Sequence, residues 1–207
     1  MAGERPVQPS STIAAPRIAL RRRFSVQPSP TTTAMNTHPS DLLPLNQGSA
    51  GFILTPCPGT RGVDAAAAVE QLAAAGAVAV LTLMPRAEMT SNGVSALGEI
   101  CAQRGLQWFH LPIDDDHAPA ADFAAAWQAQ RDAVHGLLDA GTRIAIHCKG
   151  GSGRTGLMAA QILLERGWSK EAAVAAVKAL RPNALSLPVH QEYLAQLAAG
   201  SGSQASR

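Results

Sequence analysis

The segment from Ile144 to Gly156 constrains the fold of this chain more than any other. It begins with apolar residues typical of a short buried strand, passes Cys148 and a glycine-rich loop, and continues from Arg154 with apolar residues at helical spacing. A strand that turns through glycines into a helix directs several backbone N–H groups and the positive end of the helix dipole at one place. The segment therefore predicts an anion-binding loop, called the cradle below (residues 148–154).

Cys148 stands where a nucleophile could attack a phosphate held by the cradle. The thiolate is the reactive form of cysteine, and a helix N-terminus with nearby cations lowers the pKa of a thiol from its ordinary value of about 8.5. Arg154 can bind two phosphate oxygens as a fork, which lysine cannot do. We expect phosphate to be bound by Lys149, Gly150, Gly151, Ser152, Gly153 and Arg154.

Residues beside the cradle are candidates for supporting roles. Thr155 brings a hydroxyl close to the expected position of the sulfur, where it could stabilise a leaving thiolate. His147 can orient the loop through hydrogen bonds of its ring. Lys149 can add positive field for highly anionic substrates, or it can be an ordinary solvated lysine. The other two cysteines, Cys57 and Cys101, are expected to be core residues.

Strand and helix patterns alternate along the chain from Gly51 onward. The expected strands cover residues 52–55, 78–83, 106–111 and 143–147. The expected helices cover residues 65–75, 94–104, 121–140, 155–166, 170–180 and 189–198. The first of them is expected to be capped by Asp64 and stopped by Gly76. Near-continuous apolar strands that alternate with helices predict an α/β fold, with a central, mostly parallel sheet and helices on both faces.

The two ends of the chain differ in composition from its body. Residues 1–47 are rich in Pro, Ser, Thr and Gln without an apolar period, which predicts disorder. A transit peptide and a mis-annotated extension, with translation starting at Met35, are the alternatives. We expect one globular domain over residues 48–199 and a flexible Ser/Gly-rich tail over residues 200–207.

Charge and cysteine usage exclude some classes of partner. Residues 1–34 contain five arginines and one glutamate, a charge of +4, which leaves −2 of the total of +2 for the rest. A mildly acidic body does not favour nucleic-acid binding. The longest apolar run, residues 72–84, is too short to span a bilayer, so no membrane association is expected. Three cysteines without paired spacing predict a reducing compartment, the cytoplasm.

The residues from His147 to Gly156 resemble the signature of the cysteine-dependent protein tyrosine and dual-specificity phosphatases. Further segments resemble the phosphatases of the cyclin-dependent-kinase-associated type: residues 54–61, 76–83, Glu88, residues 110–115 and residues 191–194. The resemblance covers residues 48–198. It implies a cysteine phosphatase-like fold and two-step hydrolysis through a phosphocysteine. It also implies a phosphorylated protein substrate and neither metal nor cofactor.

Such a reaction needs an acid that protonates the leaving oxygen and later deprotonates water. The loop over residues 112–119 offers Asp114, Asp115, Asp116 and His117, and the residues alone do not choose among the three carboxylates. The resemblance implies Asp115, from its spacing to the two flanking prolines. The family usually has glycine at the next position, where this chain has Asp116.

We expect a phosphatase acting on phosphotyrosine, phosphoserine or phosphothreonine in proteins. A phosphatase of phosphoinositides or other small esters is the nearest alternative, because those enzymes share Lys149, although they carry a second lysine at Ser152. A phosphate-binding module with little turnover is another alternative, because Leu187 replaces a glutamine that helps to position water in related enzymes. A sulfurtransferase ranks last. Substrate preference and oligomeric state stay open.

Overall fold

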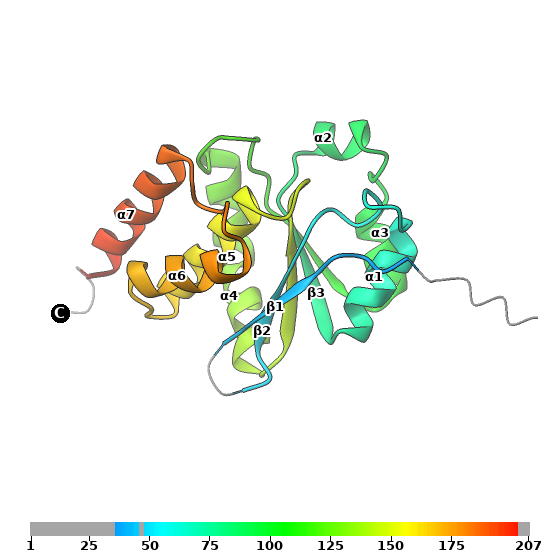
Figure 1. The fold of residues 1–207 in the computed structure, drawn as a ribbon, viewed down its shortest axis with the longest axis horizontal. Coiled ribbons are helices and arrows are strands. Elements are labelled where there is room, and N and C mark those ends of the chain that lie inside the picture. Colours follow the sequence, from blue (N-terminus) through cyan, green and yellow to red (C-terminus); the bar gives the residue numbers. More distant parts are fainter. Residues whose placement is uncertain (1–35, 46–47, 203–207) are drawn as a thin grey trace, which may run out of the picture. The chain divides into compact units, whose positions relative to one another are not determined.

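The computed structural model describes residues 36–45 and 48–202, which form a five-stranded sheet with helices on both faces (Figure 1). This is the architecture that the alternating pattern predicts. The strands are β1 (Asp41–Pro44), β2 (Gly51–Thr55), β3 (Ala77–Thr82), β4 (Gln107–His110) and β5 (Arg143–His147). The helices are α1 (Ala65–Ala74), α2 (Arg86–Ser91), α3 (Leu97–Gln103), α4 (Ala121–Asp139), α5 (Gly153–Glu165), α6 (Lys170–Leu180) and α7 (Pro188–Gly202).

The sheet has the strand order β1-β2-β5-β3-β4. The β2, β5, β3 and β4 strands run parallel, and β1 pairs with β2 in the antiparallel direction. Because β5 lies at the centre, the residues after it emerge at the middle of the carboxyl edge of the parallel strands. In open α/β sheets this edge is where ligands bind.

Each face of the sheet has its own core. Along β2, Phe52 and Leu54 belong to the core with α4–α7, whereas Ile53 between them belongs to the core with α1–α3. The β5 strand alternates in the same way around Ala145. This follows from the period of two along a strand. Figure 1 shows the two helical layers on opposite sides of the sheet.

Two helices begin at side chains that cap their first free N–H groups. Asp64, the predicted cap of α1, accepts a hydrogen bond from the backbone N–H of Ala67 at 3.0 Å. Ser169 caps α6 in the same way through Ala172. The predicted stop after α1 is also present, since Gly76 adopts a φ of 93°, which glycine tolerates best.

The N-terminal boundary of the fold differs from the prediction. Residues 36–45, expected to be disordered, are part of the domain: they include β1, and Leu43 and Leu45 are buried in its core. A four-residue edge strand between prolines is too short to give a periodic signal. The rest of that expectation, for residues 1–35 and 46–47, lies outside the described residues.

Two helical segments also differ. The α2 helix was not predicted, because it has six residues and buries only Met89 among them. The α7 helix continues to Gly202, three residues into the predicted flexible tail. Residues 203–207 of that tail lie outside the described residues.

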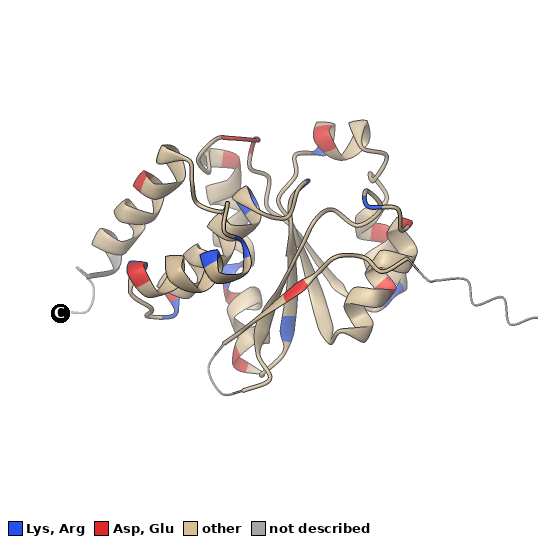
Figure 2. Ribbon diagram, in the orientation of Figure 1, with Lys and Arg blue, Asp and Glu red and all other residues tan. Residues whose placement is uncertain are grey.

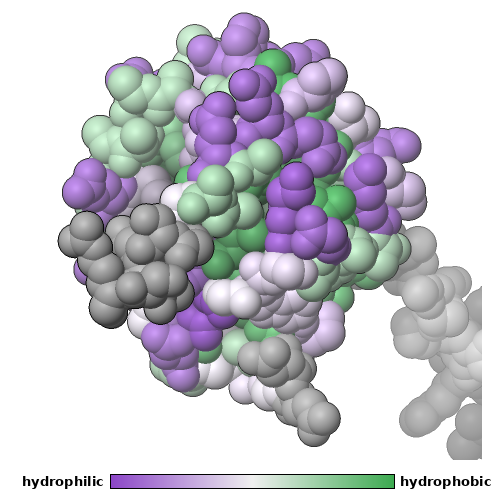
Figure 3. Space-filling view, turned by 90° about the vertical axis from the view of Figure 1, so that its left-hand side faces the viewer, coloured by the Kyte–Doolittle hydropathy of each residue, from purple (hydrophilic) through white to green (hydrophobic). Residues whose placement is uncertain are grey.

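The surface of the described residues is mixed in character. Their exposed large apolar side chains are Leu42 and Val189. Figure 3, which views the face that carries α6 and α7, shows small hydrophobic areas separated by hydrophilic groups. Within the described ranges, no helix combines the length and the apolar character needed to cross a membrane.

Candidate active site

The cradle connects the end of β5 to the start of α5, as the sequence predicts. It turns at Gly151, whose φ is 76° and where an added Cβ would lie 2.5 Å from the backbone nitrogen of Pro56. Only glycine satisfies both the conformation and the space. This close approach brings the cradle against the end of β2.

The sulfur of Cys148 lies at the floor of the cradle and accepts two hydrogen bonds. The backbone N–H of Gly151 donates to Sγ at 3.3 Å, and the hydroxyl of Thr155 donates at 3.2 Å. The Thr155 hydroxyl is therefore next to the sulfur, where the sequence predicts it. Donors on two sides, at the N-terminus of a helix, stabilise negative charge on the sulfur.

Arg154 is buried to 2% exposure and is held by Glu88 from α2. Its two terminal nitrogens lie 2.6 and 2.9 Å from the Glu88 carboxylate oxygens, and Nη1 also donates to the carbonyl of Ile113 at 3.0 Å. Burial opposes its charge, but the hydrogen bond to Glu88 and the negative charges of Cys148, Glu88 and Asp115 together outweigh this effect and raise the pKa of Arg154. The Nε–H group is buried and has no partner among the described residues. It is a free donor for an anion in the cradle.

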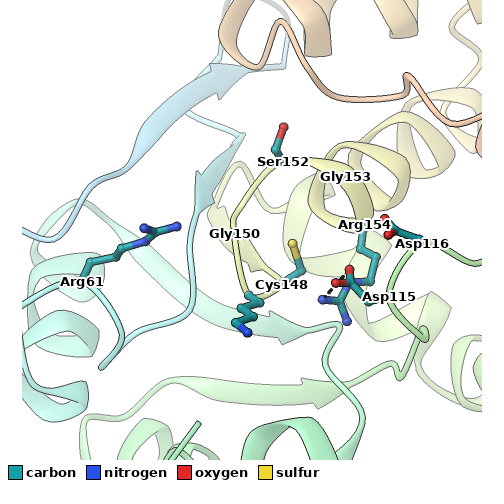
Figure 4. A pocket seen from close by; sticks show the side chains of 9 residues that line it. Arg61, Asp115, Asp116, Cys148, Gly150, Ser152, Gly153 and Arg154 are labelled. Carbon is teal, nitrogen blue, oxygen red and sulfur yellow. Dashed lines mark ion pairs between the residues drawn. The ribbon is translucent and has the colours of Figure 1, made fainter.

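The acidic loop between β4 and α4 approaches Arg154. Asp115, whose side chain is 67% exposed, has Oδ1 3.0 Å from Nη2 of Arg154. Asp115 and Asp116 line the cradle pocket, whereas Asp114 lines a neighbouring pocket with His117. Figure 2 shows this loop as an acidic segment, and Figure 4 shows Asp115 facing Arg154. The geometry thus separates three carboxylates that the residue pattern left equivalent.

The acidic loop departs from the family pattern at Asp116, and the backbone conformation shows why aspartate is tolerated there. The φ of Asp116 is 59°, in the left-handed region, at the position where glycine is usual in the resembled family. Aspartate is among the residues that tolerate this region best. The loop is also tied to α7, because Nε2 of His190 lies 3.0 Å from the carbonyl of His117. Burial lowers the pKa of His190, which keeps the ring neutral.

His147 lies beneath the cradle and is fully buried. Its Nε2 lies 2.8 Å from Oγ1 of Thr82, and its Nδ1 lies 3.3 Å from the carbonyl of Cys148. Burial lowers the pKa of His147 to about 4, so the ring is neutral near pH 7. These contacts connect the ring to the start of the cradle and to β3, and its role in orienting the loop stays a prediction.

Arg181, after α6, braces the cradle and was not recognised in the sequence. Its Nε donates to the carbonyl of Gly151 at 2.8 Å, and its Nη2 donates to the carbonyl of Leu54 at 2.7 Å. It also pairs with Asp41 of β1. No local pattern signals this role, because the three partners lie far from Arg181 in the chain.

The cradle opens into a pocket of about 340 Å³, shown in Figure 4. The predicted residues that line it are Cys148, Lys149, Gly150, Ser152, Gly153, Arg154 and Asp115. Gly151 does not line the pocket; its N–H donates to the Cys148 sulfur and its carbonyl accepts a hydrogen bond from Arg181. Arg61 also lines the pocket, and sequence reasoning did not single it out.

Two further observations concern Gln191 and metal binding. The side-chain amide of Gln191 donates to the carbonyl of Leu185, which is a contact within the fold. Among the residues that the structure describes, no group of three or more His, Cys, Asp or Glu side chains could hold a metal ion.

A nucleophile-bearing loop after the central parallel strand, closed by a buried arginine at the start of a helix, defines the class of cysteine-dependent phosphatases. Residues 59–168 match the family described as "Polymorphic toxin system, DSP-PTPase phosphatase". This match covers more than half of the chain, and the protein belongs to this DSP-PTPase phosphatase family.

The chain is also similar to individual known proteins. Cyclin-dependent kinase inhibitor 3 of Rattus norvegicus is 30% identical over 128 residues, and the match spans 59% of each of the two chains. Kinase associated phosphatase, solved with serine in place of its catalytic cysteine, has a TM-score of 0.68 at 23% identity, over 83% of this chain and 98% of that one. Human DUSP28 has a TM-score of 0.54 at 24% identity, over 74% and 94%. The two structures share the fold.

Proposed function

We propose that this protein hydrolyses phosphate monoesters on phosphorylated proteins through a phosphocysteine intermediate. The observation that carries the proposal is the pair of donors on the sulfur of Cys148 beside the free, buried Nε–H of Arg154. A nucleophile and an anion-binding group meet there in one pocket. Membership of the DSP-PTPase phosphatase family supports the same reaction.

In the first step, the thiolate of Cys148 attacks phosphorus and forms the S–P bond while the bond from phosphorus to the substrate oxygen breaks. Asp115 gives its proton to the departing oxygen, so an alcohol leaves. Arg154 and the cradle N–H groups bind the phosphoryl oxygens, on which the charge of the transition state is spread.

In the second step, water attacks the phosphocysteine, and the Asp115 carboxylate takes a proton from that water. The S–P bond breaks, inorganic phosphate forms and Cys148 returns to the thiolate. The hydroxyl of Thr155 and the N–H of Gly151 stabilise that leaving thiolate, since both already bond the sulfur.

Hydrolysis of an aryl phosphate tests the proposal. We expect turnover by the wild-type chain, loss of at least 1,000-fold in Cys148→Ser, and a phosphorylated cysteine in protein quenched in acid during turnover. Cys101→Ala is the matched control, because this thiol is buried in the opposite core and its loss should leave turnover intact. If phosphate binds but the wild type produces no turnover, the protein is a phosphate-binding module and the proposal is wrong.

A phosphatase of phosphoinositides or small phosphate esters is the second candidate. One observation favours it: Lys149 lines the pocket and makes no ion pair with the described residues, so it is available to a highly charged substrate. A panel of phosphotyrosine, phosphoserine and phosphothreonine peptides, run beside phosphoinositides, separates the candidates by kcat/KM. A higher kcat/KM for the lipids would replace the protein substrate in the proposal.

We further propose that the protein acts in the cytoplasm. Cys57, Cys101 and Cys148 are all free thiols. A cysteine nucleophile with a second thiol on the adjacent loop stays active only where disulfides are kept reduced. Subcellular fractionation tests this, and enrichment in an oxidising compartment would contradict it.

A further inference from the structure

The two rims of the cradle pocket carry opposite charge. Asp115 and Asp116 stand on one side, and Arg61 and Lys149 also line the pocket. Figure 4 shows Arg61 across the cradle from Asp115, with its guanidinium directed toward the loop at Gly150. The volume of about 340 Å³ falls within the range of small-ligand sites, about 300–1,000 Å³, so the pocket has room for more than one phosphate group.

The loop that carries Arg61 is fixed relative to the cradle. The backbone N–H of Cys57 donates to the carbonyl of Lys149 at 3.2 Å. Thr60 closes the loop, because its N–H and its hydroxyl both donate to the carbonyl of Cys57, at 3.2 and 2.7 Å. Gly62, with a φ of 74°, turns the chain directly after Arg61. The backbone of Arg61 is therefore held in a fixed position beside the phosphate site.

The charges of Arg61 and Lys149 are not neutralised within the described part of the chain. Neither makes an ion pair there, and the Arg61 side chain is exposed. Arg154, in contrast, is neutralised by Glu88 and Asp115. A free guanidinium beside an anion pocket is suited to a carboxylate or a phosphate, which it can bind as a fork.

We propose that Arg61, assisted by Lys149, forms a second-anion subsite beside the cradle. It selects phosphopeptides that carry another anionic group, a carboxylate or a second phosphate, close to the residue being dephosphorylated. The inference rests on the proposed phosphatase function and names the substrate class of that site. Asp116, on the acidic rim across the pocket, strengthens the selection, because its carboxylate repels an anion placed on that side.

Charge favours a peptide over a lipid as the substrate. Residues 35–207 carry a net charge of −2, and the pocket itself has an acidic rim. Attraction to the anionic surface of a membrane requires clustered positive charge near the site. The two cations Arg61 and Lys149, which face the carboxylates of Asp115 and Asp116, do not provide such a surface. They suit an extended peptide that carries an acidic group at a defined position.

The test compares phosphopeptides that differ in one charge. A parent peptide with neutral flanks is matched by versions with Asp, or with phosphoserine, at each of the two positions on either side of the phosphoresidue. We expect wild type to prefer the best acidic version by roughly three- to tenfold in kcat/KM, with the preference decreasing as salt is added. We expect Arg61→Gln to bring this ratio close to one.

Arg104→Gln is the matched control, because Arg104 is an exposed arginine directly after α3 with a loose ion pair at 3.9 Å. It should keep the wild-type ratio. Turnover without any acidic preference would overturn the subsite and leave the proposed function standing, whereas no turnover of any phosphoester would overturn the proposed function itself. If vesicles containing phosphoinositides are better substrates than every peptide, and Arg61→Gln removes that advantage, the peptide assignment is wrong.

Discussion

At the level of single residues, only a few groups around Cys148 contribute to the proposed chemistry. Arg154 is held by Glu88 of α2, and Gly151 is held by Arg181 after α6, so the supporting residues come from other elements. Arg154 keeps a free N–H group, while Gly151 and Thr155 donate to the sulfur. Rigid support of this kind is what positions groups for phosphoryl transfer.

The role proposed for Asp115 can be tested against its neighbours. We expect Asp115→Asn to lower kcat by about 100- to 10,000-fold while phosphate binding is largely kept, since an amide cannot deliver the proton. Asp114→Asn is the control, because Asp114 faces a different pocket and should keep most of the activity. The measurement is steady-state hydrolysis of a phosphopeptide. A larger loss in Asp114→Asn or Asp116→Asn would assign the acid elsewhere.

The three cysteines are predicted to differ in reactivity. Burial raises the pKa of Cys57 to about 12 and that of Cys101 to about 11, and both side chains are fully buried. At pH 8 both stay as thiols, which react slowly. We expect iodoacetamide to modify Cys148 first, as seen by peptide mass spectrometry, and phosphate to slow that modification.

The control for this experiment is the chain unfolded in guanidinium chloride, in which the three cysteines should react at similar rates. Modification of Cys57 or Cys101 before Cys148 in the folded chain would contradict the assignment of the nucleophile.

At the scale of elements, α4 and α5 are joined through one carboxylate. Glu165 is half-buried, which opposes its charge, but hydrogen bonds from His135, Gln161, Arg131 and Trp127 outweigh this burial and lower the pKa of Glu165 to about 2. We expect Glu165→Gln to lower the free energy of unfolding by about 2–3 kcal/mol at pH 7.

The pH dependence of that difference has a defined sign. A carboxyl group with a lowered pKa in the folded state contributes stability above its unfolded pKa, and the contribution is lost as pH falls through the folded value. The difference between wild type and Glu165→Gln should therefore shrink from about pH 4.5 toward pH 2 in urea titrations. Asp139→Asn, which breaks an exposed ion pair to Arg166, is the control and should cost less than about 1 kcal/mol. A difference that does not change with pH would contradict the assignment.

Arg181 joins a helix end, two strands and the cradle. We expect Arg181→Met, which keeps the apolar stem but removes the donors to Gly151 and Leu54, to lower kcat/KM by about tenfold. The change should raise the Kd for inorganic phosphate, because the cradle loses its brace. Lys178→Met, in the last turn of α6, is the control. An equal loss of kcat/KM in both variants would mean that the change at Arg181 acts through the stability of the fold and not through the cradle.

These elements also explain what could be predicted from the sequence. The cradle and the central strand were recognisable, because their glycines, apolar run and helix follow one another within a single segment. The places of Arg61 and Arg181 beside the cradle were not recognisable, because both residues lie far from the cradle in the chain and only the tertiary fold brings them next to it. The α2 helix, which supplies Glu88, was missed because six residues are too few for a helical period.

At the scale of the whole molecule, the domain extends further toward the N-terminus than composition indicates. The β1 strand pairs with β2 along its full length, and Leu43 and Leu45 add to the core with α4–α7. Asp41 in this strand also pairs with Arg181, the brace of the cradle. The edge strand β1, which was expected to be disordered, is thus connected through Arg181 to the proposed catalytic loop.

We therefore propose that the phosphatase domain begins near residue 36, and truncation tests this boundary. A chain that starts at Met35 should keep the melting temperature and the turnover of the full chain. A chain that starts at Gly48 loses β1 and leaves β2 with an unpaired edge and uncovered apolar surface. We expect the shorter chain to be destabilised by several kcal/mol and to lose activity even where it folds, because Arg181 loses Asp41. Equal stability and turnover in the two truncated chains would return the boundary to residue 48.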